Sequence, residues 1–197
     1  MSETVLDSIR AKAKALGRKV CLTESDDPRN LQAAAKLVQL GYAKPVLVGD
    51  EDAIVKLAAE NGIDLTGVEI VDVLKTPNLD KYIAKAVELR KSKGLTEEQA
   101  REMLKDTCVF SAVMVCSGDA HGYVSGGGNP KGYNHNTAQK TKPALQFFKT
   151  APGSKIASAF FIMQMPDKKW GHNGVFFYAD CGLNINPTAD QLAEIAV

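Results

Sequence analysis

Residues 19–49 read KVCLTESDDPRNLQAAAKLVQLGYAKPVLVG, and this stretch decides the fold. The apolar run 19–23 is typical of a short strand. The acidic turn 24–29, with a proline at a helix start, precedes an alanine-rich segment that predicts a helix ending at Gly41. The apolar run 45–49 predicts the next strand. Strand, helix and strand in this order favour a parallel sheet with helices on both faces.

The same alternation continues along the chain. We expect a helix from about residue 50 to 60, a strand over 68–71 and a helix over 79–93. Thr96 to Gln99 has the pattern of a capping box, so another helix begins there. The apolar stretch 108–116 is compatible with a helix or a strand, because periodicity alone does not separate the two.

Composition excludes several classes of protein. The 197 residues are 45% apolar and 24% charged, with a net charge of +1, so no global basic field indicates a nucleic-acid partner. The first 19 residues predict an amphipathic helix rather than a secretory signal, and no window reaches transmembrane length. The four cysteines are widely spaced and indicate neither a zinc site nor a disulfide framework. We therefore expect a cytoplasmic protein without a membrane partner.

The sequence changes character after residue 150. A break at 152–154 is followed by two apolar runs, 156–165 and 174–179, which flank a polar connector and predict a hairpin. Thr188 is a plausible N-cap for a final helix over 189–196.

This change predicts two domains. Residues 1–150 are expected to form an N-terminal α/β domain, and residues 151–197 the start of a second domain that is incomplete. A hairpin with one helix makes a poor core by itself, because a two-stranded unit is marginal in water unless its apolar face is covered.

A glycine-rich segment, 118–128, runs on through 134–137 to 142–150 and is a candidate anion-binding loop. Backbone amides freed by glycine, small hydroxyls and lysines are the groups that hold phosphate oxygens. Across this segment the only acid is Asp119, against four lysines: Lys131, Lys140, Lys142 and Lys149. The alternative is an ordinary surface turn, because no complete Walker or dinucleotide fingerprint is present.

Other chemistry-bearing residues have competing interpretations. His135, set among amides and a threonine, fits a hydrogen-bond donor to an oxyanion better than a metal ligand. Arg90 either contacts an anion or complements the negative end of its helix. Cys116 is interpreted as a buried thiol, because no base is evident beside it. The acids Glu24, Asp26 and Asp27 are interpreted as caps of the following helix, with a carboxylate site as the alternative.

Several short motifs together resemble the phosphate acetyltransferase family, also called phosphotransacetylase. They are LTESDDPR (22–29), LQAAA (31–35), VLVG (46–49), ELRKSKG (88–94), GDA (118–120), VSG (124–126), PALQ (143–146) with KT (149–150), ADCG (179–182) and NPT (186–188). The resemblance runs from the first helix to the last residue.

The resemblance implies a fold, a reaction and a site. It implies a three-layer α/β/α sheet domain of the isocitrate/isopropylmalate dehydrogenase type, with a second α/β domain across a cleft. The implied reaction is reversible acetyl transfer between coenzyme A and inorganic phosphate, giving acetyl phosphate, with no permanently bound cofactor, no metal and a homodimeric assembly. The substrate-binding residues it implies are Arg90, Ser125, Gly126, His135, Thr137 and Lys142.

The chain also departs from the family pattern. Residues 128–134 look like an insertion, and Lys142 replaces the arginine that usually precedes the proline. Lysine keeps the charge but loses the planar fork that grips phosphate in two places. His121 stands where the family often has aspartate.

The chain ends little more than halfway along a typical member, so the catalytic residues are expected in the missing part. Two alternatives therefore stay open: a catalytically inactive remnant of the family, and a relative similar to phosphate butyryltransferase.

Overall fold

The computed structural model describes residues 4–126 and 137–197. The chain divides into two compact units, which we call the sheet unit (residues 10–148) and the hairpin unit (residues 149–197 with the chain up to Ile9). Helix α1 (Val5–Leu16) contributes to both. The domain boundary expected near residue 150 stays a prediction.

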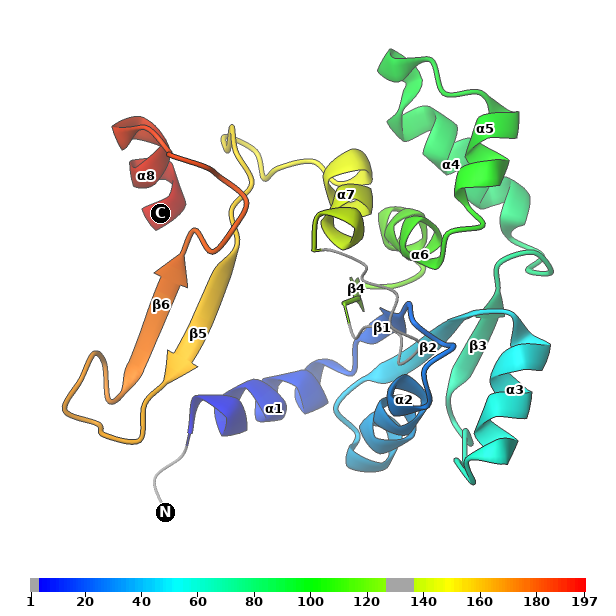
Figure 1. Cartoon of the computed structure of the whole chain (residues 1–197), viewed down its shortest axis with the longest axis horizontal. Coiled ribbons are helices and arrows are strands. Elements are labelled where there is room, and N and C mark those ends of the chain that lie inside the picture. The colour runs from blue at the N-terminus through cyan, green and yellow to red at the C-terminus, as the bar shows by residue number, and fades with distance from the viewer. Residues whose placement is uncertain (1–3, 127–136) are drawn as a thin grey trace. The chain divides into compact units, whose positions relative to one another are not determined.

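The sheet unit is built on four parallel strands in the order β3-β2-β1-β4 (Figure 1). They are β1 (Lys19–Leu22), β2 (Lys44–Gly49), β3 (Glu69–Asp72) and β4 (Gly122–Val124). In the register, Cys21 of β1 lies opposite Val46 of β2 and Tyr123 of β4. The predicted strands are confirmed, and β4 is a short addition from within the glycine-rich segment.

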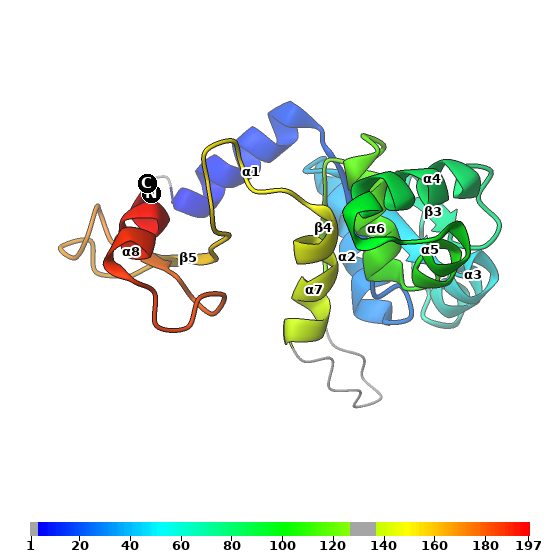
Figure 2. The same ribbon diagram turned by 90° about the horizontal axis from the view of Figure 1, so that it is seen from above.

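Each face of the sheet is covered by its own helices. Successive strand residues point to opposite faces, so apolar side chains of the same strands pack with helices on both sides. On one face Leu22 and Leu47 pack with residues of α2 (Pro28–Leu40) and α3 (Glu51–Glu60). On the other, Cys21, Val46 and Val48 pack with α4 (Leu79–Leu89), α5 (Glu97–Met103) and α6 (Thr107–Cys116). Figure 2 shows these three helices gathered over the sheet. The predicted three-layer α/β/α architecture is confirmed.

The ambiguous stretch 108–116 is a helix, α6. Asp106 caps it, accepting hydrogen bonds from the backbone N–H groups of Cys108 and Val109 at 2.8 and 3.1 Å. Residues 108–114 are all buried, since α6 lies between the sheet, α4 and α7 (Thr137–Phe147). A helix buried on every side has no polar face, which explains why its sequence lacks helical periodicity.

The predicted ends of the helices are close to those observed. Thr96 and Gln99 form the expected capping box of α5. The helix predicted over 79–93 is too long, because α4 ends at Leu89 and a tighter 3-10 turn, η1 (Lys91–Lys93), follows it. Gly94 then ends the turn with φ +68°, a backbone conformation that favours glycine.

In the hairpin unit, β5 (Phe160–Gln164) and β6 (Val175–Ala179) pair antiparallel, as predicted. Helix α8 (Ala189–Ala196) starts at the predicted Thr188, whose side chain forms a capping box with Gln191. The strands are largely exposed and include four exposed aromatic side chains: Phe160, Phe161, Phe177 and Tyr178. Across both described ranges, no helix is long and apolar enough to cross a membrane.

Candidate functional site

The strand order places a crevice at the carboxyl edge of the sheet. From β1 the chain continues through β2 to β3 on one side, and it returns to β4 on the other side of β1. Ligands of open parallel sheets bind at such a switch point, outside the carboxyl ends of the strands. Residues 23–26 follow β1 and residues 125–126 follow β4, so both segments begin at this crevice.

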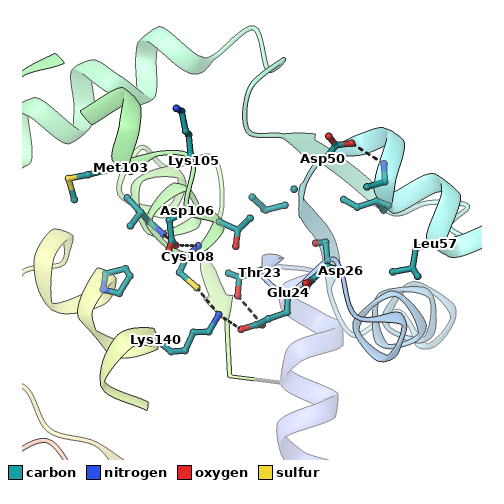
Figure 3. Close-up of a pocket in the computed structure, with 18 of the residues that line it drawn as sticks. Thr23, Glu24, Asp26, Asp50, Leu57, Met103, Lys105, Asp106, Cys108 and Lys140 are labelled. Carbon is teal, nitrogen blue, oxygen red and sulfur yellow. Dashed lines mark hydrogen bonds and ion pairs between the residues drawn. The ribbon is translucent and has the colours of Figure 1, made fainter. Parts of the chain in front are cut away.

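A cavity of about 1080 Å³ lies beside these segments (Figure 3). Its walls come from the ends of β1 and β2, from α3, from the start of α6 and from α7. The charged lining residues are of both signs: Lys56, Lys105, Lys140, Lys142, Glu24, Asp26, Asp50, Glu60, Glu102 and Asp106. Two exposed pairs, Lys56 with Glu60 and Lys105 with Glu102, neutralise part of this charge.

Glu24 is the centre of the polar contacts in this cavity. Its Oε1 accepts hydrogen bonds from Ser125 Oγ at 2.9 Å, from the Gly126 backbone N–H at 2.9 Å and from Lys140 Nζ at 2.8 Å. Its Oε2 accepts a bond from Thr23 Oγ1 at 3.0 Å. Figure 3 shows the Lys140 side chain reaching Glu24 from α7. One carboxylate thus joins the ends of β1 and β4 to α7.

These contacts keep both charged groups ionised. Burial raises the pKa of Glu24, but the hydrogen bonds from Lys140, Gly126 and Ser125 outweigh it, and the net pKa lies below its ordinary value. Burial lowers the pKa of Lys140, and the hydrogen bond to Glu24 with the neighbouring Cys108 raises it above the ordinary value overall. A carboxylate with a lowered pKa is a poor general base, so Glu24 is unsuited to removing a thiol proton.

Cys108 lies against the same group of residues, at the start of α6. Its Sγ is 3.2 Å from Ser125 Oγ and 3.6 Å from Lys140 Nζ. The thiol is buried, and the first amides of α6 already bond to Asp106. The amino end of α6 is therefore capped from within the chain.

The structure brings together part of the predicted site. Ser125 and Gly126 meet at Glu24, and Lys142 lines the cavity. Thr137 is the first residue of α7. His135 and the expected insertion 128–134 lie outside the described residues.

Arg90 contacts the end of α7 from the end of α4. Its Nη1 donates a hydrogen bond to the Gln146 carbonyl oxygen at 3.2 Å, and its guanidinium carbon lies 5.8 Å from the centre of the Phe147 ring. Gln146 lines the cavity, whereas Arg90 does not. One alternative from the sequence is that Arg90 complements the negative carboxyl end of its own helix, α4. In the structure its side chain instead bonds a carbonyl near the carboxyl end of another helix, α7.

The interpretation of Glu24 as a helix cap is wrong. The N-cap of α2 is Asp27, whose Oδ1 accepts the Arg29 backbone N–H at 2.9 Å, and Glu24 lies three residues too early for that role. In the sequence, no local pattern distinguishes Lys140 from the other three lysines of its segment. The switch-point rule identifies Glu24, but it needs the strand order as well as the sequence, and Lys140 is placed there by helix α7.

Two other residues lie away from the cavity. His121 immediately precedes β4, at the opposite end of that strand from Ser125, and its Nδ1 accepts the Lys19 backbone N–H at 3.2 Å. Cys116 is half-buried rather than buried as interpreted from the sequence, and partial burial raises the pKa of its thiol. Within residues 4–126 and 137–197, no three His, Cys, Asp or Glu side chains gather as a metal-binding group.

Comparison with known proteins identifies the family. A family model described as "Phosphate acetyl/butaryl transferase" matches residues 4–197. The chain belongs to this family. Among curated relatives, the phosphate acetyltransferase of Acetivibrio thermocellus is 47% identical over 192 residues, covering 98% of this chain and 55% of that protein. The phosphate acetyltransferase of Escherichia coli is 41% identical over 188 residues, covering 94% of this chain and 24% of that protein.

Solved structures agree on the phosphate acetyl/butaryl transferase fold. A phosphotransacetylase from Streptococcus pyogenes superposes with a TM-score of 0.86 at 32% identity, covering 98% of this chain and 56% of that one. The EutD phosphotransacetylase from Staphylococcus aureus gives a TM-score of 0.83, also at 32% identity, covering 98% of this chain and 54% of that one. The chain spans about half the length of these relatives and of the first curated ones.

Proposed function

We propose that the chain supplies the phosphate-binding wall of a phosphate acetyltransferase, which exchanges an acetyl group between coenzyme A and inorganic phosphate. The observation that carries this proposal is the convergence of Ser125 Oγ, the Gly126 N–H and Lys140 Nζ at the switch point of a chain of this family. Preorganised donors of this kind stabilise the charge that develops on phosphoryl and acyl oxygens. Acetyl phosphate and coenzyme A act as substrates, and no permanently bound cofactor is required.

The proposed substrate contacts are Arg90, Ser125, Gly126, His135, Thr137 and Lys142. Lys142 lines the cavity and is a point charge for a phosphate group. Arg90 does not line the cavity, so as a substrate contact it exchanges its bond to the Gln146 carbonyl of α7 for one to the ligand. The remaining parts of the proposal are a cytoplasmic location, a homodimeric assembly and a domain boundary near residue 150.

The decisive assay mixes the purified chain with coenzyme A and acetyl phosphate and follows thioester formation by absorbance. We expect Lys142→Ala to weaken binding of acetyl phosphate about tenfold or more, a loss of about 1.4 kcal/mol or more, with a matching fall in any thioester formation. Lys142→Arg, which restores a planar fork, should bind phosphate more tightly than the native chain. Lys36→Ala is the matched control, since Lys36 is an exposed lysine of α2 outside the cavity.

Two alternative functions each have a specific supporting observation. The chain covers 55% and 57% of the length of two curated relatives, and Lys142 stands where the family resemblance implies an arginine; both favour a remnant that binds ligands without turnover. The family description also names butaryl transferase, so butyryl phosphate belongs in the assay as a second substrate. Binding of coenzyme A without thioester formation would support the remnant. Faster turnover of butyryl phosphate than of acetyl phosphate would support the second alternative.

A further inference from the structure

Three hydrogen-bond donors converge on a single oxygen of Glu24. They are a hydroxyl, a backbone amide and an ammonium group, at 2.9, 2.9 and 2.8 Å from Oε1. The set comes from two separate elements, the loop after β4 and helix α7. A small set of amide, hydroxyl and ammonium donors is also what a bound phosphate oxygen requires. The carboxylate therefore occupies an environment suited to an oxyanion.

The position of Glu24 is enclosed. Its side chain is 6% exposed and that of Lys140 is 15% exposed, so solvent screens the pair only weakly. With Glu24 in place, the charge of Lys140 is neutralised and all three donors are already used. A phosphate group approaching them would meet a saturated site and the repulsion of a buried carboxylate.

We propose that Glu24 is the internal occupant of an oxyanion site, and that a small phosphate ligand reaches Ser125, Gly126 and Lys140 only when the Glu24 carboxylate moves out. The inference rests on the proposed function for the identity of the ligand, inorganic phosphate or the phosphoryl group of acetyl phosphate. Because the donor set is enclosed, it fits a small anion rather than the bulky phosphates of coenzyme A. Glu24 is then a specificity-determining residue that lowers the affinity of the ligand-free chain for phosphate.

The expected effect on phosphate affinity follows from the population of the open state, in which the Glu24 carboxylate has left the three donors. The apparent dissociation constant equals the intrinsic one divided by the fraction of molecules in which Glu24 has left the site. If that fraction is about one in ten, removing the carboxylate tightens phosphate binding about tenfold. A merely structural role for Glu24 predicts the reverse, because loss of its bonds would loosen the loop after β4 and weaken binding.

The test is calorimetric titration of the full chain and its variants with inorganic phosphate. Glu24→Gln keeps the shape of the side chain and removes its charge, and we expect it to bind phosphate about tenfold or more tightly than the native chain. Adding Lys140→Met to this variant should abolish the gain. Glu102→Gln is the matched control, since Glu102 lines the same cavity but pairs with Lys105 instead of the donor set.

Equal or weaker phosphate binding by a folded Glu24→Gln variant overturns the inference, as does an equal gain in Glu102→Gln. Thermal melting by circular dichroism checks folding. If Glu24→Gln does not fold, Glu24→Met replaces it, because this neutral side chain of similar length leaves the donors free and should also tighten binding. A native chain that forms thioester, with variants that show no gain, refutes this inference alone. A gain for phosphate in a chain without thioester formation leaves it standing and counts against the proposed activity.

Discussion

Replacing Lys140 with methionine should destabilise the sheet unit by about 3 kcal/mol at neutral pH. The substitution keeps the length and apolar stem of the side chain but removes the ammonium group that lies 2.8 Å from Glu24 Oε1. At that separation and an effective dielectric constant of about 20, the direct attraction is about 6 kcal/mol. The cost of burying both charges offsets part of this attraction, and removing one partner of a buried pair costs about 3–5 kcal/mol.

The double variant Glu24→Gln/Lys140→Met separates the loss of the pair from the loss of packing. It leaves no uncompensated buried charge, so we expect it to lie within about 1 kcal/mol of the native chain. Lys105→Met is the matched control, because Lys105 pairs with Glu102 where both side chains are more than half exposed. Exposed pairs contribute about 0–1 kcal/mol, so this variant should be close to native.

Urea denaturation followed by far-ultraviolet circular dichroism reports mainly on the helices of the sheet unit. The single tryptophan, Trp170, lies in the hairpin unit and gives a separate fluorescence signal for it. Lys140→Met should shift the dichroism transition and leave the Trp170 transition in place. A shift below about 1 kcal/mol for Lys140→Met, or a double variant as unstable as the sum of the single ones, would refute the reasoning.

The same experiment has a defined pH dependence. The Glu24 pKa is lowered in the folded chain, so the pair stabilises the fold at pH values above the ordinary carboxyl pKa, about 4.3. That contribution is lost as the pH falls through the lowered folded-state pKa. The difference in stability between the native chain and Lys140→Met should therefore shrink on acidification, and a constant difference would contradict the assigned pair.

Three further predictions concern other parts of the sheet unit. Phe110→Ala should cost about 3–5 kcal/mol by urea denaturation, because this fully buried ring packs edge-on against Tyr82 at 5.0 Å; a loss below about 1 kcal/mol would mean that the site is not part of the core. Thr96→Ala should cost about 1 kcal/mol and speed amide exchange at the start of α5, and unchanged exchange would argue against the capping box. Asp72→Asn should cost about 1–3 kcal/mol near pH 7, because the buried Asp72 carboxylate accepts three backbone N–H groups. Burial raises the Asp72 pKa but these bonds lower it overall, so the cost should diminish as the pH falls below about 4, and a cost that stays constant down to pH 3 would argue against the carboxylate role.

Most elements of the sheet unit could be predicted because their signals are local. A strand such as 45–49 and a cap such as Thr96 with Gln99 are defined by residues a few positions apart, and the structure has both. Helix α6 could not be assigned, since burial on all sides removes the periodicity that distinguishes a helix from a strand. The register and the short strand β4 also depend on pairing between distant segments.

The candidate site divides in the same way. The sequence by itself determined the α/β class and the family resemblance. It also identified Ser125, Gly126 and Lys142 as candidate site residues, because the order of the motifs and the chemistry of the residues are properties of the sequence. Only the tertiary structure decided that Glu24 contacts Ser125 and Gly126 and that Asp27, not Glu24, caps α2. Glu24 and Ser125 are 101 residues apart in the chain, and they meet because the return from β3 to β4 places two strand ends side by side. The contact between the Glu24 carboxylate and Ser125 therefore depends on the strand order, which no local pattern of residues specifies.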